Sequence, residues 1–353
     1  MFNLLKSKSL FFIGTTFVVY KYFENSFMNE LLASGKREEY ISDYKKIFLL
    51  KSLFGRTRSK CIGKLLNINI PILIRRRLYG FIINNYLAKN PEGKTPEGNI
   101  CYFEKRFTKP LESYNSIGEL FTRSMNPSEI KIYEIDDYKS VSSPCEGRII
   151  EFGRIFSNKC IQLKSSTFLI SELLQENFES LIKNSNLYYS IIYLSPKNYH
   201  RFHTPSKIKI NLIRHVTGEC FPVFKGIASR LNNLFSLNER IVINSNWKYG
   251  KMYIIAVAAH GVSDIKLFCI PKLKTNENNT KPNYLMDKTQ EQVTREYTNF
   301  CDQENKGIYN KGEEIGLFSL GSTIIVIFQA PDTFKFTIKK GEDVQLGSPL
   351  GSV

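Results

Sequence analysis

One serine, two histidines and one glutamate are the residues of this 353-residue chain whose types and order favour chemistry. Ser322 follows Gly321 in the tetrapeptide Leu-Gly-Ser-Thr, inside an apolar, β-branched run close to the C-terminus. Because glycine has no Cβ, the carbonyl of Gly321 is open to attack, and its backbone can adopt conformations that other residues resist. The sequence therefore predicts either a self-cleaving Gly321-Ser322 bond or a plain β-strand with a Gly-Ser turn.

The chain holds four histidines, and two of them, His200 and His203, share the segment YLSPKNYHRFHTP at 193–205. An H-x-x-H pair can bind a metal from one face of a helix, but neither an HExxH motif nor a cysteine pair supplies further ligands, so we expect no metal. The flanking Ser-Pro and Thr-Pro dipeptides predict an ordered loop, where catalytic imidazoles are often presented. Two solvated surface histidines are the alternative interpretation.

Glu146 lies in the turn-like segment VSSPCEGRII at 141–150, just before an apolar strand. A carboxylate at a strand entrance is usually solvated. Together with His203 and Ser322, however, it completes a set in which the carboxylate orients the imidazole and the imidazole takes the hydroxyl proton. Spacing in the sequence does not show whether the three side chains meet.

The elements that must position these residues are short, β-branched segments separated by turns. Before them, residues 29–98 show a helical pattern with basic clusters, and the Pro/Gly-rich segment 90–99 marks a boundary. The polar, Asn-rich segment at about 274–312 predicts a flexible insertion just upstream of the Gly-Ser bond. We therefore predict an α+β protein with a β-rich core of the antiparallel sheet or sandwich type, preceded by N-terminal helices. The segments predicted as strands are 148–156, 188–194, 208–216, 240–243 and 252–259.

Residues 1–28 have the layout of a targeting or anchor segment, because lysines flank the apolar run SLFFIGTTFVVY at 9–20. The run is short, since a transmembrane helix needs about 20 apolar residues. A signal peptide, an interfacial anchor and an organelle presequence all fit it, and the lack of a clear A-x-A cleavage site favours retention at a membrane over secretion. The helices of 29–98 fit amphipathic helices on a bilayer or helices packed on the core.

The composition of the chain indicates which partners it could bind and whether its cysteines are reduced. The chain has 49 Lys and Arg against 33 Asp and Glu, a formal charge of +16. This charge favours nucleic acid or an acidic lipid surface as partner, although an Asn-, Lys- and Ile-rich composition also scatters lysine over any surface. The seven cysteines are odd in number and form no CxxC pair, which predicts reduced structural thiols.

Further motif-like segments occur in a fixed order along the chain after residue 110. They are LFTR at 120–123, SPCEG at 143–147, SPKNYHRFH at 195–203, GECFPV at 218–223, NER at 238–240, and the segments 257–267 and 316–328. Together they resemble the phosphatidylserine decarboxylase family, of the type I kind whose processing motif is LGST. One such motif would be weak evidence for the family, but the occurrence of all of them in this order is specific to it.

The resemblance implies a lyase that makes its own cofactor by autocatalytic cleavage of a zymogen. Ser322 Oγ would attack the Gly321 carbonyl, and an N-to-O acyl shift, β-elimination and hydrolysis would leave a covalent pyruvoyl group (pyruvate) on the new N-terminus. His203 would act as the base, oriented by Glu146. The products would be a β chain of residues 1–321 and an α chain of residues 322–353, paired as a heterodimer and assembled further into a homodimer of such pairs.

In turnover, the resemblance implies that the pyruvoyl ketone forms a Schiff base with the amine of phosphatidylserine, that carbon dioxide leaves, and that His200 returns a proton to give phosphatidylethanolamine. A lipid substrate gives the anchor and the positive charge a common purpose at an anionic membrane, so we expect no nucleic acid partner. The expected organisation is an anchor at 1–28, membrane-associated helices at 29–98 and a decarboxylase domain at 99–353.

The resemblance also narrows the location. The LGST type suggests the mitochondrial inner membrane, while the few arginines of the N-terminal segment keep the endoplasmic reticulum as a competitor.

Two positions depart from the family pattern, which has Asp where this chain has Glu146 and Asn198. The extra methylene of Glu146 moves its carboxylate by roughly an ångström, enough to alter a hydrogen bond to an imidazole. If that change blocked processing, the chain would be an inactive membrane-binding homologue. The other alternative is a Ser-His-Glu hydrolase without chain cleavage, although LGST is not the G-x-S-x-G nucleophile elbow.

Overall fold

The computed structural model describes a subset of the chain. The described residues are 56–86, 95–163, 166–182, 186–223, 225–229, 231–261, 264–276, 294–298, 307–319 and 323–353. The chain divides into two units, Met1–Leu49 and Leu50–Val353, and all described residues belong to the second. The predicted anchor at 1–28 therefore lies outside the described residues. In the part of the chain that is described, no helix is both long and apolar enough to cross a membrane.

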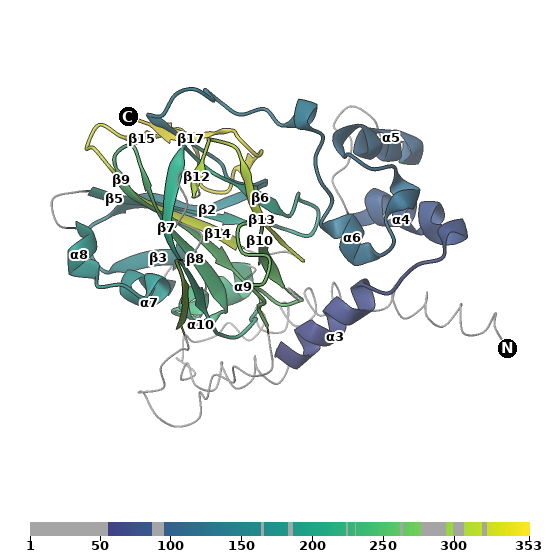
Figure 1. Cartoon of the computed structure of the whole chain (residues 1–353), viewed down its shortest axis with the longest axis horizontal. Coiled ribbons are helices and arrows are strands. Elements are labelled where there is room, and N and C mark those ends of the chain that lie inside the picture. The colour runs from purple at the N-terminus through teal and green to yellow at the C-terminus, as the bar shows by residue number, and fades with distance from the viewer. Residues whose placement is uncertain are drawn as a thin grey trace, which may run out of the picture. The chain divides into compact units, whose positions relative to one another are not determined.

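Helices occur mainly before the strands in the described chain (Figure 1). They are α3 Arg56–Leu66, α4 Ile72–Tyr86, α5 Pro96–Arg106, α6 Ile117–Phe121, α7 Ile170–Leu174, α8 Phe178–Ile182, α9 Lys225–Ala228 and α10 Leu234–Leu237, with 3₁₀ turns at Leu111–Ser113 and Pro127–Glu129. The helix α5 starts inside the Pro/Gly-rich segment 90–99. Thr95 caps it by accepting from the N–H of Gly98 (3.1 Å), and proline follows at the first helical position, where its missing N–H costs nothing. The boundary predicted between residues 98 and 99 thus falls within a helix.

The strands pair antiparallel throughout, which confirms the predicted α+β class with a β-rich antiparallel core. They are β1 Ser140–Ser142, β2 Gly147–Ile155, β3 Lys159–Leu163, β4 Ser166–Leu169, β5 Asn186–Tyr193, β6 Arg201–His203, β7 Ile208–Val216, β8 Arg240–Trp247, β9 Gly250–Val257, β10 Ile265–Leu267, β11 Thr294–Tyr297, β12 Ile308–Tyr309, β13 Glu314–Phe318, β14 Thr323–Ala330, β15 Lys335–Phe336, β16 Asp343–Val344 and β17 Pro349–Ser352. The five segments predicted as strands correspond to β2, β5, β7, β8 and β9.

A nine-stranded sheet dominates the described chain. Its order is β11-β7-β8-β9-β14-β5-β2-β16, and β12 also pairs with β7. Two three-stranded sheets, β10-β13-β6 and β1-β17-β15, and the hairpin β3-β4 complete the strands. β11 and β12 belong to the segment predicted as a flexible insertion, and both add to the edge of the large sheet. The rest of that segment, at 277–293 and 299–306, lies outside the described residues.

The strand β14 occupies the middle of the large sheet, bonded to β5 on one side and β9 on the other. Its apolar, β-branched sequence TIIVIFQA is buried along almost its whole length, as a strand covered on both faces requires. Phe328 from β14 packs edge-on against Phe334 (5.0 Å between ring centroids) and near-parallel to Tyr188 of β5 (5.9 Å). The C-terminal segment is therefore an integral part of the core.

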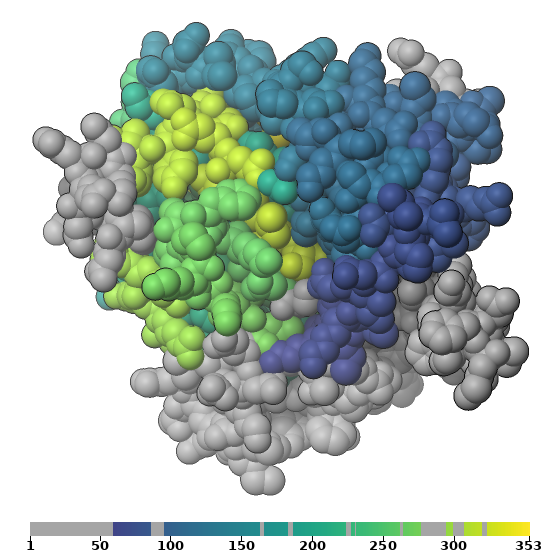
Figure 2. Space-filling model, turned by 45° about the vertical axis from the view of Figure 1, so that its right-hand side comes forward, coloured from purple at the N-terminus to yellow at the C-terminus, as the bar shows by residue number. Residues whose placement is uncertain are grey.

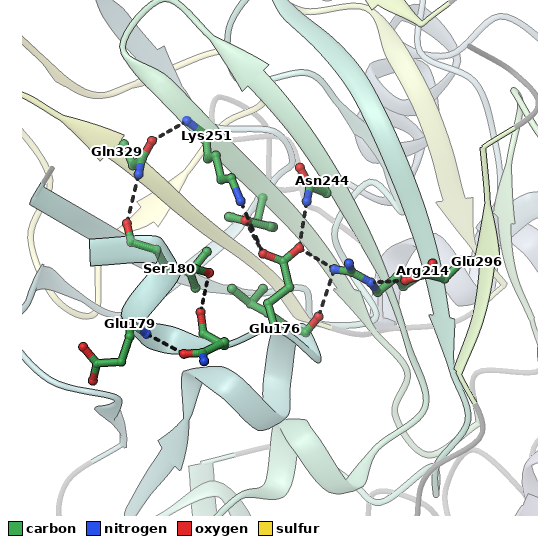
Figure 3. A network of polar contacts seen from close by, with 12 residues as sticks. Glu176, Glu179, Ser180, Arg214, Asn244, Lys251, Glu296 and Gln329 are labelled. Atoms are coloured by element: carbon green, nitrogen blue, oxygen red, sulfur yellow. Dashed lines mark hydrogen bonds and ion pairs between the residues drawn. The ribbon is translucent and has the colours of Figure 1, made fainter. Parts of the chain in front are cut away.

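A polar network on the large sheet holds the turn after α7 and the strand β11 in place (Figure 3). Glu176 accepts from Arg214 (2.5 Å), Asn244 (2.8 Å) and Tyr253 (2.7 Å), and Arg214 also pairs with Glu296 of β11 (2.7 Å). Burial tends to raise the pKa of Glu176, but the hydrogen bonds from Arg214 and Tyr253 outweigh it and hold the pKa below its usual value. The carboxylate is therefore ionised and satisfied, which identifies this cluster as structural.

Candidate active site

The segment that carries the Gly-Ser bond leads from β13, in a three-stranded sheet, to β14, in the large sheet. Just after β13, the N–H of Ser319 donates to the carbonyl of Asp264 (3.0 Å). Asp264 is held in turn by Thr275, whose hydroxyl donates to its carboxylate (2.9 Å). Residues 320–322 lie outside the described residues, so the contacts of Ser322 stay a prediction.

His200 lies beside the end of β13. It immediately precedes β6, and its carbonyl accepts from the N–H of Phe318 (2.9 Å), the last residue of β13. Its ring is fully buried and meets the ring of Phe121 edge-on, with 5.4 Å between centroids. The strand pairing thus brings His200 to the strand that leads into the Gly-Ser bond.

The imidazole of His200 has unused hydrogen-bonding capacity. Neither ring nitrogen is within hydrogen-bond geometry of a partner among the described residues, although the backbone of Asn198 lies near enough to oppose weakly the lowering of the pKa of His200. Burial, and next the guanidinium of Arg123, lower the pKa of His200 to about 3, so the ring is neutral near neutral pH. Leaving buried polar atoms unpaired costs stability, which favours a chemical role for this residue over a packing role.

His203 is buried as well, but both of its ring nitrogens have partners. Nδ1 lies 2.8 Å from the carbonyl oxygen of Gly312, and Nε2 lies 3.3 Å from the hydroxyl of Tyr199. Because a carbonyl only accepts, Nδ1 carries the ring proton and Nε2 keeps the lone pair. Burial lowers the pKa of His203, which keeps the ring in this neutral, basic form.

Glu146 is 4% exposed and makes two charge-assisted contacts. One carboxylate oxygen pairs with Arg106, from the last turn of α5, and the other accepts from the backbone N–H of Tyr199 (3.2 Å). Burial opposes the charge on Arg106, but Glu146 outweighs it and raises the pKa of Arg106. Between the described side chains of Glu146 and His203 there is no direct hydrogen bond, but Tyr199 contacts both, through its backbone N–H and its hydroxyl.

Two loops bring Glu146, His200 and His203 into one buried region. The N–H of His203 donates to the carbonyl of Pro144 (2.8 Å), which joins the loop of Glu146 to the loop of the histidines. The turn before the histidines is closed by Asn198, whose amide oxygen accepts from the N–H (2.9 Å) and the hydroxyl (2.7 Å) of Ser195. An amide oxygen serves as well as a carboxylate in this turn, so the departure at position 198 leaves the loop intact.

Arg123 supports the same region from the LFTR segment. It is 3% exposed, and its guanidinium donates to the carbonyl of Asn198 (3.2 Å) and lies over the rings of Phe107 (4.5 Å) and Phe103 (5.1 Å). Burial lowers its pKa to about 10, so it stays cationic at neutral pH. Because it lies close enough to His200 to lower that pKa, Arg123 contributes to the neutral state of the imidazole.

Sequence reasoning singled out the three acid and base residues but missed Arg106, Tyr199 and Gly312. Tyr199 and Arg123 lie inside motifs that were noted, which was a usable signal. Arg106 and Gly312 carry no such signal, because they contact the site only through tertiary packing. As for metals, no group of three or more His, Cys, Asp or Glu side chains in the described chain is arranged to hold an ion.

Comparison with known proteins places the chain in a family. The family model described as phosphatidylserine decarboxylase matches residues 117–352, more than half of the chain, and the protein belongs to that family of carboxy-lyases, which are made as proenzymes.

Individual relatives match the sequence of this chain over most of their own length. A phosphatidylserine decarboxylase proenzyme 1, mitochondrial, of Toxoplasma gondii is 36% identical over 92% of this chain and 71% of its own. A phosphatidylserine decarboxylase proenzyme of Plasmodium falciparum is 34% identical over 98% of this chain and 90% of its own. The mitochondrial proenzyme of Caenorhabditis elegans is 31% identical over 89% and 75%.

Proposed function

We propose that this chain is a phosphatidylserine decarboxylase that cuts itself between Gly321 and Ser322 and converts Ser322 into a pyruvoyl group. Beyond the family membership, the observation that carries the proposal is the buried imidazole of His200, whose nitrogens are unpaired and whose main-chain carbonyl bonds to Phe318, the last residue of the strand that leads to this bond. A buried base without a partner at such a place has a chemical use.

The two histidines take different roles in this proposal. His203 is the base of self-cleavage, because its Nε2 carries the lone pair of the ring; the Tyr199 hydroxyl holds this lone pair by a long contact (3.3 Å) and releases it when Nε2 takes the proton of Ser322 Oγ. Glu146 contributes through its contact with Tyr199. His200 returns the proton to the α-carbon after carbon dioxide has left.

The pyruvoyl group supplies an electron sink for the loss of carbon dioxide from the serine headgroup. The described surroundings fit it, because residues 324–328 of β14 are fully buried and His200 has free hydrogen-bonding capacity. Buried apolar neighbours restrict bulk water, which protects a reactive ketone.

A cut at this bond yields a small α chain, 322–353, that we propose stays bound to the β chain, 1–321. Three of its four described strands pair with the large chain: β14 with β5 and β9, β16 with β2, and β17 with β1. The heterodimer is therefore held without a covalent link. The homodimer expected from the resemblance stays a prediction.

The direct test incubates the purified protein with phosphatidylserine in mixed micelles and measures phosphatidylethanolamine and carbon dioxide. Denaturing mass spectrometry of the same sample should show a small chain that begins at position 322 with a ketone in place of its amine. An intact chain that hydrolyses esters would instead support the hydrolase alternative, and an intact, inert chain the inactive homologue.

The described geometry gives the hydrolase alternative no support. A hydrolytic triad places a carboxylate on the second ring nitrogen of its histidine, whereas Nδ1 of His203 faces the carbonyl of Gly312.

We further propose that α4 docks on an anionic membrane. Leu73 is 90% exposed, and Leu73, Arg77 and Phe81 follow one another at four-residue spacing, so they share one exposed face of the helix. Figure 2 shows α3 to α5, in purple and blue, on the surface of the molecule. An apolar face with an arginine between its members fits the boundary between acyl chains and acidic headgroups.

We propose that this membrane is mitochondrial. The names of the Toxoplasma and Caenorhabditis relatives contain the word mitochondrial, and they give no support to the endoplasmic reticulum.

Replacing Leu73 and Phe81 by glutamate should weaken binding to vesicles that contain an acidic phospholipid by at least about tenfold, because burying a side chain of this size contributes about 1.5–3 kcal/mol. Vesicle co-sedimentation measures the change. Phe156, which is 82% exposed in the turn after β2, provides the control. If Phe156→Glu weakens binding as much as the α4 variant does, α4 is not the docking face.

A further inference from the structure

The resemblance to the family implies an aspartate at position 146, and the structure shows what the longer glutamate of this chain contacts. Glu146 does not touch His203 but pairs with Arg106 and accepts from the N–H of Tyr199. All three partners are largely buried, with side-chain exposures of 12% for Arg106 and 5% for Glu146, and Tyr199 is fully enclosed. A fixed pair of this kind orients the main chain at Tyr199.

The side chain of Tyr199 continues from this fixed point to the imidazole. Its hydroxyl lies 3.3 Å from Nε2 of His203 and 3.5 Å from a carboxylate oxygen of Glu314, so the nearer acceptor is the imidazole. Its ring packs near-parallel to Phe107, the residue that caps α5 (6.4 Å between centroids). Burial raises the pKa of Tyr199, so the phenol keeps its proton and acts as a donor.

Nε2 is the nitrogen that this contact controls. Since Nδ1 is fixed by the carbonyl of Gly312, the ring is held at both ends, by a main-chain acceptor and by a phenol donor. A hydrogen bond donated to a neutral imidazole favours the neutral form over the charged one. The phenol of Tyr199 therefore acts both on the orientation of the base and on its protonation.

We propose that Tyr199 is the positioning residue through which Glu146 sets the imidazole of His203, and that Arg106 anchors the carboxylate for this task. The proposal rests on the proposed self-cleavage and deepens it, because it names the residues that prepare the base.

Tyr199→Phe tests this contact while keeping the ring. The variant is made by cell-free synthesis, and the rate of appearance of the small chain is followed after transfer to buffers across the acid and neutral range. We expect cleavage to slow by about five- to tenfold, as the loss of one hydrogen bond implies, because the loss of the contact that orients the ring outweighs the release of the Nε2 lone pair. The acid limb of the rate profile should move to higher pH, because the imidazole loses the donor that favours its neutral form.

Charged and titratable groups around His203 enter the interpretation of that profile. Glu314 and Arg201 face it from β13 and β6, and Glu146 lies across Tyr199. Tyr199→Phe leaves these side chains in place and removes only the phenol, with its contacts to Nε2 of His203 and to Glu314, so a moved acid limb reports the loss of the phenol. Tyr189→Phe is the matched control, since it removes a buried hydroxyl that donates to the carbonyl of Ile161 in β3 (3.4 Å), away from the histidines, and should cleave at the wild-type rate.

A double-mutant cycle with Glu146→Gln tests the order of the contacts. If Glu146 acts through Tyr199, the double variant should be no slower than the slower single variant, whereas independent roles would multiply the two effects. Multiplying effects, or a Tyr199→Phe chain with an unmoved acid limb, would overturn the proposal. A wild-type chain that stays intact would instead refute the proposed function itself, and this proposal with it.

Discussion

The variant Ser322→Ala should remain a single full-length chain and form no phosphatidylethanolamine. Without the hydroxyl there is no nucleophile for the Gly321 carbonyl and no precursor of the ketone, so cleavage and decarboxylation are lost together. Denaturing electrophoresis and intact-mass measurement show the first loss, and lipid analysis shows the second. The fold should persist, because the substitution removes a single oxygen atom.

Ser319→Ala is the matched control for this variant. Ser319 lies in the same segment, and its described contact to Asp264 is made by its backbone N–H, which alanine retains. The control should therefore cleave like the wild type. Two fragments from Ser322→Ala would end the self-processing mechanism, whereas failure of both variants would point to a folding defect in the segment.

Substitution of His200 by glutamine should separate the two reactions. We expect the chain to cleave, because His203 is the proposed base of that step, but to form product about 10²–10⁴ times more slowly, as the loss of a general acid implies. With a pKa of about 3, the ring of His200 is neutral near neutral pH. It can therefore donate either a proton that it has first taken up from its surroundings or the proton of its own ring N–H. A steady-state assay on fully cleaved protein measures the loss.

His203→Gln is the counterpart and should stay uncleaved. The pair of variants forms the comparison, since both remove a buried imidazole from the same loop. If His200→Gln stayed intact while His203→Gln cleaved, the two roles would have to be exchanged. If His200→Gln cleaved and turned over at the wild-type rate, its unpaired nitrogens would have no part in catalysis.

Much of the fold was predictable because the strands carry strong local signals. The segment 208–216 was predicted with the bounds of β7, since its apolar residues are β-branched and turn residues flank it. The start of helix α5 was harder to predict from the sequence. Pro and Gly in 90–99 predict a break, whereas in the structure Thr95 and Pro96 start a helix there. Local composition alone does not distinguish these two uses of proline.

The residues of the candidate site could likewise be predicted only in part. Glu146, His200 and His203 could be selected because a few side-chain types do acid and base chemistry and these stood in recognisable segments. The pairing of Arg106 with Glu146 could not, because forty positions separate them in the chain and only the packing of α5 on the core brings them together. The route from Glu146 through Tyr199 likewise depends on side-chain reach, which residue types do not reveal.

The central place of β14 has a consequence for the lifetime of the enzyme. If the chain is cut just before β14, the fold has been assembled from one continuous chain, but afterwards a middle strand belongs to a separate 32-residue peptide (353 minus 321). Unfolding would release that peptide, and reassembly would require a second-order insertion between β5 and β9 that the original folding never faced. Maturation would therefore make folding a one-way event, and the working enzyme would persist by a slow rate of unfolding rather than by an equilibrium it can re-enter.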